Sequence, residues 1–242
     1  MKSTSVEPRE QPGHHHPYPS AVSSPRGVFM TGATGYLGRP LTEALVARGH
    51  GVRALVRGAS VARLAPRVEP VVGDALDPSP WARAVRAGDV VVQLVGVAHP
   101  SPRKAPEFER LDRGSAEATA QVARSAGASR LVYVSVAQPA PIMQAYIAAR
   151  AAGEAAVRAT GLPATILRPW YVLGPGHRWP LLLWPFYAMA SLLPRSRAAA
   201  RRLGLVTRAQ MLAALIRAIE STEPGVEIVE VPDIKRARGR QS

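Results

Sequence analysis

The sequence predicts an α/β fold, a doubly wound parallel sheet, and three observations support this prediction. A short apolar run leads into a glycine-rich turn at Val28–Gly38, which reads V-F-M-T-G-A-T-G-Y-L-G. Short β-branched runs alternate with segments of helical spacing along most of the chain. The runs are almost continuously apolar, which is typical of parallel strands covered on both faces. We therefore expect the turn and the strand ends along one edge, where such sheets bind ligands.

The order of elements follows from these patterns. Strands are predicted in the β-branched runs at Val28–Thr31, Gly51–Val56, Val68–Val72, Val90–Val95, Leu131–Val136, Ala164–Leu167 and Val226–Val231. Helices are predicted between them at Tyr36–Arg48, Ser60–Ala65, Ser79–Ala87, Arg113–Ala126, Ala145–Ala159 and Arg208–Glu220. Residues 174–207 are irregular and rich in Pro, Trp and Leu, which suggests a lid. One domain is thus expected over residues 26–231.

The two ends of the chain differ from this domain in composition. Residues 1–25 carry five prolines, His14–His16 and many polar groups, so we expect a disordered leader. Three adjacent histidines in such a leader are a poor preformed metal site, and no metal site is predicted. No apolar segment follows Lys2, so we expect a cytoplasmic rather than a secreted protein. Residues 232–242, with K-R-A-R-G-R at Lys235–Arg240, are expected to form a basic, solvated tail.

Composition limits the classes of function. The 242 residues are 47% hydrophobic, which is ample for one core, and they contain no cysteine. Disulfides, thiolate catalysis and cysteine-ligated zinc are therefore excluded. The net charge of +14 is typical of proteins that bind nucleic acid or anionic membranes. Because the arginines are scattered along the chain, we predict no specific nucleic-acid partner.

The glycine-rich turn has the spacing of a dinucleotide site. Gly32 can adopt the backbone angles of a tight turn, Gly35 lets a pyrophosphate approach, and Gly38 lets the helix pack on the strand. The N-terminus of that helix would then face the anion. The cofactor-binding residues predicted within the turn are Gly32, Thr34, Gly35, Tyr36, Leu37 and Gly38.

The end of the second predicted strand favours NADP over NAD. In this arrangement an acidic residue near that point binds the ribose hydroxyl of NAD, whereas an arginine accommodates the 2′-phosphate of NADP. The strand is followed by Arg57, and no Asp or Glu occurs between Glu43 and Glu69. Arg53 and Arg63 are expected to add positive charge there. A general abundance of arginine is the alternative explanation.

One long apolar stretch stands out, at Trp179–Leu193, which reads W-P-L-L-L-W-P-F-Y-A-M-A-S-L-L. It falls short of the ~20 residues that span a bilayer and contains two prolines. A lid over a substrate pocket is the first interpretation. A surface that docks on a membrane or a protein partner is the second, because arginines flank the stretch on both sides.

Four motifs together resemble the atypical short-chain dehydrogenases/reductases, a superfamily of NAD(P)-binding Rossmann folds. They are the turn T-G-A-T-G-Y-L-G, V-G-D-A at 72–75, V-Y-V-S ending at Ser135, and L-R-P at 167–169. The resemblance covers residues 26–231 and includes the epimerase/dehydratase-like and complex I accessory-subunit-like groups. It implies that Asp74 and Ala75 lie near the adenine and that Val95, Gly96 and Pro169 line the cofactor. A turn cap is the alternative role for Asp74.

The superfamily's reaction uses a Tyr for proton transfer, a Lys four residues later and a Ser that orients the substrate. The resemblance assigns these roles to Tyr146, Arg150 and Ser135, so an arginine stands where the lysine is usual. Arginine keeps the charge, yet its planar fork cannot reproduce a compact ammonium beside the phenol. A helix that merely packs against the sheet would also explain the Tyr146 and Arg150 pair.

Two classes of function remain open from the sequence. The first is an NADP-dependent oxidoreductase on a small carbonyl or alcohol, with a small molecule as partner. The second is a non-catalytic nucleotide-binding module, a redox sensor or accessory subunit, that docks through Trp179–Leu193. A third possibility, a nucleotide-sugar epimerase, is less favoured, because such enzymes usually have a larger substrate domain than residues 174–242 can form. Helices flanking such sheets often make dimers, so a homodimer is a further expectation.

Overall fold

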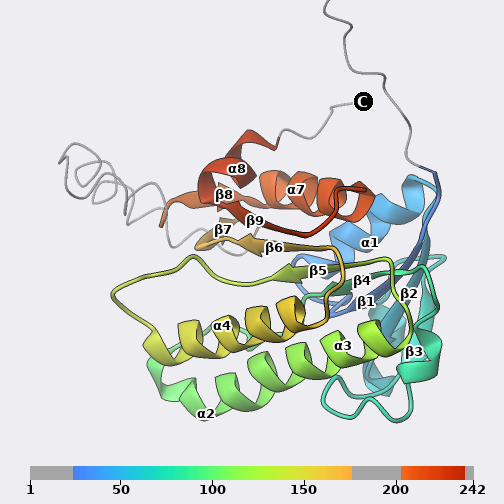
Figure 1. The fold of residues 1–242 in the computed structure, drawn as a ribbon, viewed down its shortest axis with the longest axis horizontal. Coiled ribbons are helices and arrows are strands. Elements are labelled where there is room, and N and C mark those ends of the chain that lie inside the picture. The colour runs from blue at the N-terminus through green and yellow to red at the C-terminus, as the bar shows by residue number, and fades with distance from the viewer. Residues whose placement is uncertain (1–23, 176–202, 238–242) are drawn as a thin grey trace, which may run out of the picture.

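A parallel sheet of seven strands runs through the molecule, and the computed structural model describes it within residues 24–175 and 203–237 (Figure 1). All six strand pairings are parallel. The spatial order is β3 (Glu69–Val72), β2 (Gly51–Val56), β1 (Gly27–Thr31), β4 (Val90–Gln93), β5 (Arg130–Val134), β6 (Ala164–Arg168) and β9 (Val226–Glu230). The predicted doubly wound sheet is confirmed, and its strand order reverses between β1 and β4.

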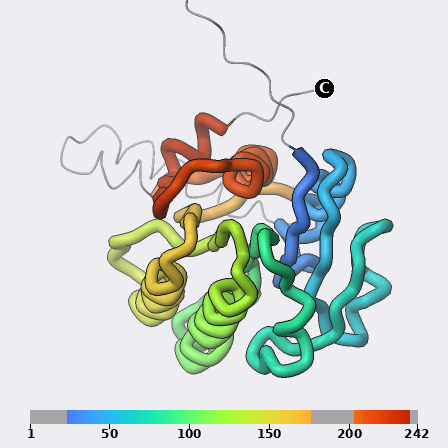
Figure 2. Tube along the Cα trace, turned by 45° about the vertical axis from the view of Figure 1, so that its right-hand side comes forward, coloured from blue at the N-terminus to red at the C-terminus, as the bar shows by residue number. Residues whose placement is uncertain are grey.

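Helices cover both faces of the sheet. Figure 1 shows α1 (Gly38–Ala47) and α7 (Arg208–Glu220) on one face, and α3 (Gly114–Ser125) and α4 (Gln144–Ala159) on the other. The same two layers are visible in the tube of Figure 2.

Each face has its own apolar core because successive side chains of a strand point to opposite faces. From β1, Met30 packs with Leu41 of α1 and Leu215 of α7. Its neighbour Phe29 packs in the other core, with Ala120 of α3. This division explains why the strands read as continuous apolar runs.

The predicted helix at Ser79–Ala87 is wrong. The structure has only a short 3₁₀ turn there, at Ala82–Ala84. Pro78 and Pro80 lack the N–H groups that a helix would use. Trp81 instead stacks on Phe29 in the core, with ring centroids 5.6 Å apart, and donates its Nε1 hydrogen to the carbonyl of Asp74 at 2.8 Å.

Several elements of the described residues were not predicted. A short helix α2 (Ala105–Glu107) runs through a π-helical turn at Phe108–Arg113 into α3. The strands β7 (Tyr171–Leu173) and β8 (Leu205–Thr207) form a small parallel pair of their own.

A further unpredicted element, α8 (Val231–Arg236), corrects the expected tail. Ile234 is completely buried in the core that also contains α1 and α7. Lys235 and Arg236 are exposed, as expected, but belong to this helix. The structured part therefore continues past residue 231.

Several predictions fall outside the described residues, namely most of the leader with His14–His16, the end of the basic tail, and the stretch Trp179–Leu193. Within the ranges that are described, every helix is too short or too polar to cross a bilayer.

Candidate functional site

The glycine-rich turn lies at the carboxyl end of β1, where the strand order reverses. Gly32 has a φ of 75°, and a Cβ there would lie 2.9 Å from the carbonyl carbon of Leu94. A Cβ at Gly38 would overlap the carbonyl oxygen of Gly32, so α1 packs directly on the turn. Gly35 is exposed, and a Cβ there would meet only that same oxygen, at 3.2 Å. The outer side of the turn is thus open to a bound anion at the start of α1.

Two arginines lie against this turn. The Nη2 of Arg63 donates to the carbonyl of Thr34 at 3.3 Å. The guanidinium carbon of Arg208 lies 5.4 Å from the ring centroid of Tyr36. Burial raises the pKa of Tyr36, and the charge of Arg208 opposes that rise. Leu37, which was also predicted within the turn, packs against the core. The positive charge of both arginines suits a diphosphate.

The arginines near β2 divide into two kinds. Arg57 follows the strand directly and is exposed. Arg53 lies within the strand, is buried, and donates to both carboxylate oxygens of Asp89, at 2.7 and 2.6 Å. The expectation that Arg53 supplies charge to the ribose site is therefore wrong, because Asp89 neutralises it inside the protein.

Asp74 and Ala75 follow β3 as predicted, but the carboxylate is used locally. Its Oδ1 accepts a hydrogen bond from the N–H of Leu76 at 2.9 Å, which is the turn-capping alternative. Asp74 is exposed, and Ala75 packs beside the core. Their place near an adenine stays a prediction.

The loops after β4 and β6 are held by backbone contacts. The N–H of Val95 donates to Oε1 of the buried Gln93 at 3.2 Å, beside the glycine turn. The carbonyl of Pro169, which is buried, accepts from the N–H of Ala137 at 2.9 Å. These bonds fix the strand ends that would line a cofactor.

Tyr146 and Arg150 lie together on α4, as their spacing predicts. The guanidinium carbon of Arg150 is 5.3 Å from the ring centroid of Tyr146 and 5.9 Å from that of Tyr133. Its Nη1 donates to the carbonyl of Val134 at 2.8 Å, and its Nη2 pairs with Asp112 at 2.7 Å. The charge therefore lies over the ring of Tyr146 and is already paired.

Electrostatics keep Arg150 protonated although it is buried. Burial lowers the pKa of this arginine, but the charges of Tyr146, Tyr133 and Asp112 outweigh burial and raise it. Burial also raises the pKa of the Tyr133 phenol, against the influence of Arg150. The site therefore contains a permanent cation between two tyrosine rings.

Ser135 follows β5 but is engaged elsewhere. It is 3% exposed, and its hydroxyl donates to Glu154 of α4 at 2.6 Å. Arg168, the last residue of β6, donates to the same carboxylate at 2.8 and 2.5 Å and to Glu230 at 3.1 Å. With its proton donated to Glu154, the Ser135 oxygen can only accept a hydrogen bond from a substrate. That it orients a substrate stays a prediction.

Sequence reasoning missed two acids of this site, Asp112 and Glu154. Both are almost fully buried, and each is the partner of an arginine. Glu154 lies four residues after Arg150, a spacing that could have indicated that it shares a helix face with Arg150 and Tyr146. No local signal marks Asp112, because its partner lies 38 residues later in the chain, at Arg150.

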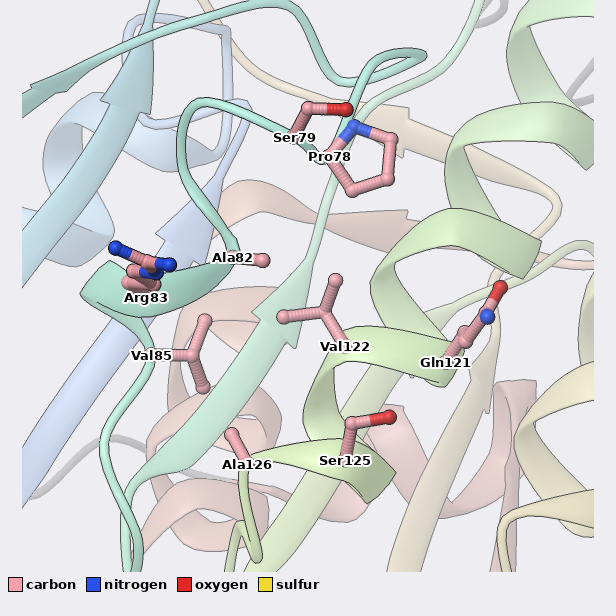
Figure 3. A pocket seen from close by; sticks show the side chains of 9 residues that line it. All are labelled: Pro78, Ser79, Ala82, Arg83, Val85, Gln121, Val122, Ser125 and Ala126. Carbon is pink, nitrogen blue, oxygen red and sulfur yellow. The ribbon is translucent and has the colours of Figure 1, made fainter.

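The hollow drawn in Figure 3 lies away from these residues. It measures about 430 Å³ and lies between the segment before β4 and the second half of α3. Ala82 and Val85 face Val122 across it (Figure 3). None of the predicted site residues lines this hollow.

Known proteins resemble this chain in sequence and in fold. The family described as NAD(P)H-binding matches residues 32–176, more than half of the chain. A ceramide reductase of Caulobacter vibrioides is 34% identical over 214 residues, covering 87% of this chain and 66% of the relative. A 3-diazoavenalumate denitrifying reductase of Streptomyces is 38% identical over 175 residues, covering 62% and 57%. The chain thus spans two thirds or less of the length of these relatives.

Solved structures share the fold. The Bordetella bronchiseptica enzyme WbmH in complex with NAD+ superimposes with a TM-score of 0.63 at 20% identity, covering 84% of this chain and 75% of that one. This likeness confirms the predicted fold, a parallel sheet of the Rossmann type. From its glycine turn, its strand order and this family match, the chain belongs to the NAD(P)H-binding family of reductase-like Rossmann proteins.

Proposed function

We propose that the chain is an NADP-dependent reductase of a carbonyl group on a largely apolar molecule, with Tyr146 as the proton donor. The observation that carries the proposal is the pairing of Tyr146 with the buried cation Arg150. Helix α4, which carries both residues, begins after the loop that follows β5. That loop lies at the same edge of the parallel sheet as the glycine turn. Such a tyrosine can act as a general acid toward a substrate oxygen.

The residues present fit a bound dinucleotide. Gly35 is exposed, Arg57 is exposed directly after β2, and Arg63 contacts the glycine turn, so these arginines would be available to an adenosine ribose phosphate. When bound, the nicotinamide would supply the hydride. The missing acid after β2 supports NADP as that cofactor.

The surroundings of Tyr146 support an apolar substrate. Its ring belongs to one apolar cluster with Val97, Phe108 and Met143, and to another with Val136, Ile147 and Trp170. Ile142, on the loop just before it, is 55% exposed. The relative from Caulobacter vibrioides is named for a ceramide, a lipid.

Replacement of one tyrosine hydroxyl tests this function. We expect Tyr146→Phe to lower the rate of NADPH-dependent reduction of apolar ketones and aldehydes ~10²–10⁴-fold, because it removes the acid. Tyr171→Phe, a matched loss of a phenol on β7, should leave the rate unchanged. NADPH oxidation is followed at fixed substrate concentration. A Tyr146→Phe variant as active as Tyr171→Phe would contradict the assignment.

A non-catalytic nucleotide-binding module is the second candidate, and one observation favours it. The Ser135 hydroxyl and the Arg150 charge are both already engaged by buried acids. Under this alternative, NADP binds tightly while a panel of ketones, aldehydes and quinones gives no turnover. Copurification with a larger assembly or with liposomes would add support for it.

A further inference from the structure

Two residues four apart on one helix meet two residues four apart on its neighbour. The rings of Phe108 and Tyr146 are 5.0 Å apart between centroids. The carboxylate of Asp112 and the guanidinium of Arg150 are 2.7 Å apart. Residues at this spacing share a helix face. The π-helical turn Phe108–Arg113, of a kind found frequently at functional sites, thus presents both partners to α4.

Asp112 also holds a third element, the loop after β4. Its Oδ2 accepts a hydrogen bond from the N–H of Val97 at 3.2 Å. Gly96 passes so close that a Cβ there would overlap Nη2 of Arg150 and lie 2.8 Å from Oδ1 of Asp112. One carboxylate therefore connects α4 with the loop beside the glycine turn.

The burial of this pair makes each partner depend on the other. The side chain of Asp112 is 0% exposed and that of Arg150 is 7% exposed. A buried charge that loses its partner is strongly unfavourable. Burial raises the pKa of Asp112, while Arg150 and the Val97 N–H lower it. The carboxylate and the guanidinium thus behave as one unit.

We propose that Asp112 is a positioning residue that, through Arg150 and the Gly96–Val97 backbone, aligns Tyr146 with the bound coenzyme. The alignment of Tyr146 rests on the proposed function. The hold on the loop after β4 does not, because it concerns nucleotide binding alone. The two parts can therefore be measured separately.

A double-mutant cycle tests the inference. The variants are Asp112→Asn, Arg150→Met and the two combined, with Glu109→Gln as the control. Glu109 lies in the same π-helical turn but is exposed and pairs with Arg113 at the surface. NADPH affinity is measured by fluorescence titration, and kcat and KM by NADPH oxidation.

We expect Asp112→Asn to lower kcat ~10- to 100-fold, because small misplacements of reacting groups cost about that much. Affinity for NADPH should fall about tenfold, with the KM of the carbonyl substrate little changed, because the loop loosens without losing substrate contacts. Glu109→Gln should change neither value. The combined variant should match Arg150→Met alone in kcat, since Asp112 acts on Tyr146 through Arg150. It should bind NADPH more weakly than Arg150→Met, because the Val97 N–H loses its carboxylate acceptor as well.

Two results would overturn the inference, namely an Asp112→Asn variant that behaves like Glu109→Gln, or losses of kcat that multiply in the combined variant. If Asp112→Asn does not fold, the combined variant, whose pair is neutral, is compared with Arg150→Met. A lower kcat in the combined variant, or an unchanged NADPH affinity, then contradicts the inference. If the unmodified protein turns over no carbonyl, the proposed function fails, while the NADPH affinities still decide the part played by Asp112.

Discussion

At the scale of single residues, three largely buried arginines of the described part of the chain are paired with acids. Arg53 pairs with Asp89, Arg150 with Asp112 and Arg168 with Glu154, each in a largely buried place. Unpaired burial of these cations would be unfavourable, and the pairs remove that cost. A high arginine content therefore does not by itself mark a binding surface. Exposed arginines at strand ends, such as Arg57, are the informative ones.

The tight contact at Gly96 gives a prediction at this scale. Gly96→Ala should destabilise the protein by about 1–3 kcal/mol, because the added methyl group overlaps the Arg150 and Asp112 pair. Gly51→Ala is the control, since a Cβ there meets nothing within 4 Å. The free energy of unfolding in urea measures both. Equal stabilities of the two variants would show that the site accommodates the methyl group.

At the scale of elements, α7 shows how local sequence sets a boundary. The predicted helix Arg208–Glu220 is confirmed at both ends. Thr207 accepts a hydrogen bond from the N–H of Gln210 at 3.2 Å, and the Gln210 side chain accepts from the N–H of Thr207 at 2.9 Å. This capping box sets the N-terminal end of the helix at Thr207, which is also the last residue of β8.

Removal of that cap should have a measurable effect. Thr207→Ala should lower the free energy of unfolding by about 1 kcal/mol, because the first turn of α7 loses its side-chain acceptor. Thr222→Ala, an exposed threonine beyond the end of the same helix, is the matched control. Thermal or urea denaturation of both variants gives the comparison. A Thr207→Ala variant as stable as the control would mean that packing alone holds the helix start.

At the scale of the whole molecule, most of the sheet could be predicted. Helices cover both faces of its parallel strands, so the strands appear in the sequence as continuous apolar runs. The glycine turn could also be predicted, because the contacts that require glycine at positions 32 and 38 are with residues a few positions away or on the neighbouring strand. The helix at Ser79–Ala87 was wrong because burial of Trp81 against Phe29 overrides helical spacing.

The chemistry of the site was harder to predict than its place. Tyr146 and Arg150 are four residues apart and could be found together. Asp112 could not, because only the packing of the π-helical turn on α4 brings it to Arg150. Arg53 lies within β2 and Arg57 directly after it, yet the first is buried and the second exposed. Such distinctions depend on tertiary contacts.

The central claim is that the glycine turn and its neighbouring arginine bind NADP, and titration calorimetry tests it most directly. NADPH and NADH are titrated into the unmodified protein, Arg57→Asp, and the control Arg67→Asp, an exposed arginine before the amino end of β3. We predict tighter binding of NADPH than of NADH. Arg57→Asp should weaken NADPH about 10- to 100-fold and NADH little, because it removes a charged hydrogen bond to phosphate, while Arg67→Asp changes neither. No heat with either coenzyme, or equal losses for both in Arg57→Asp, would contradict the claim.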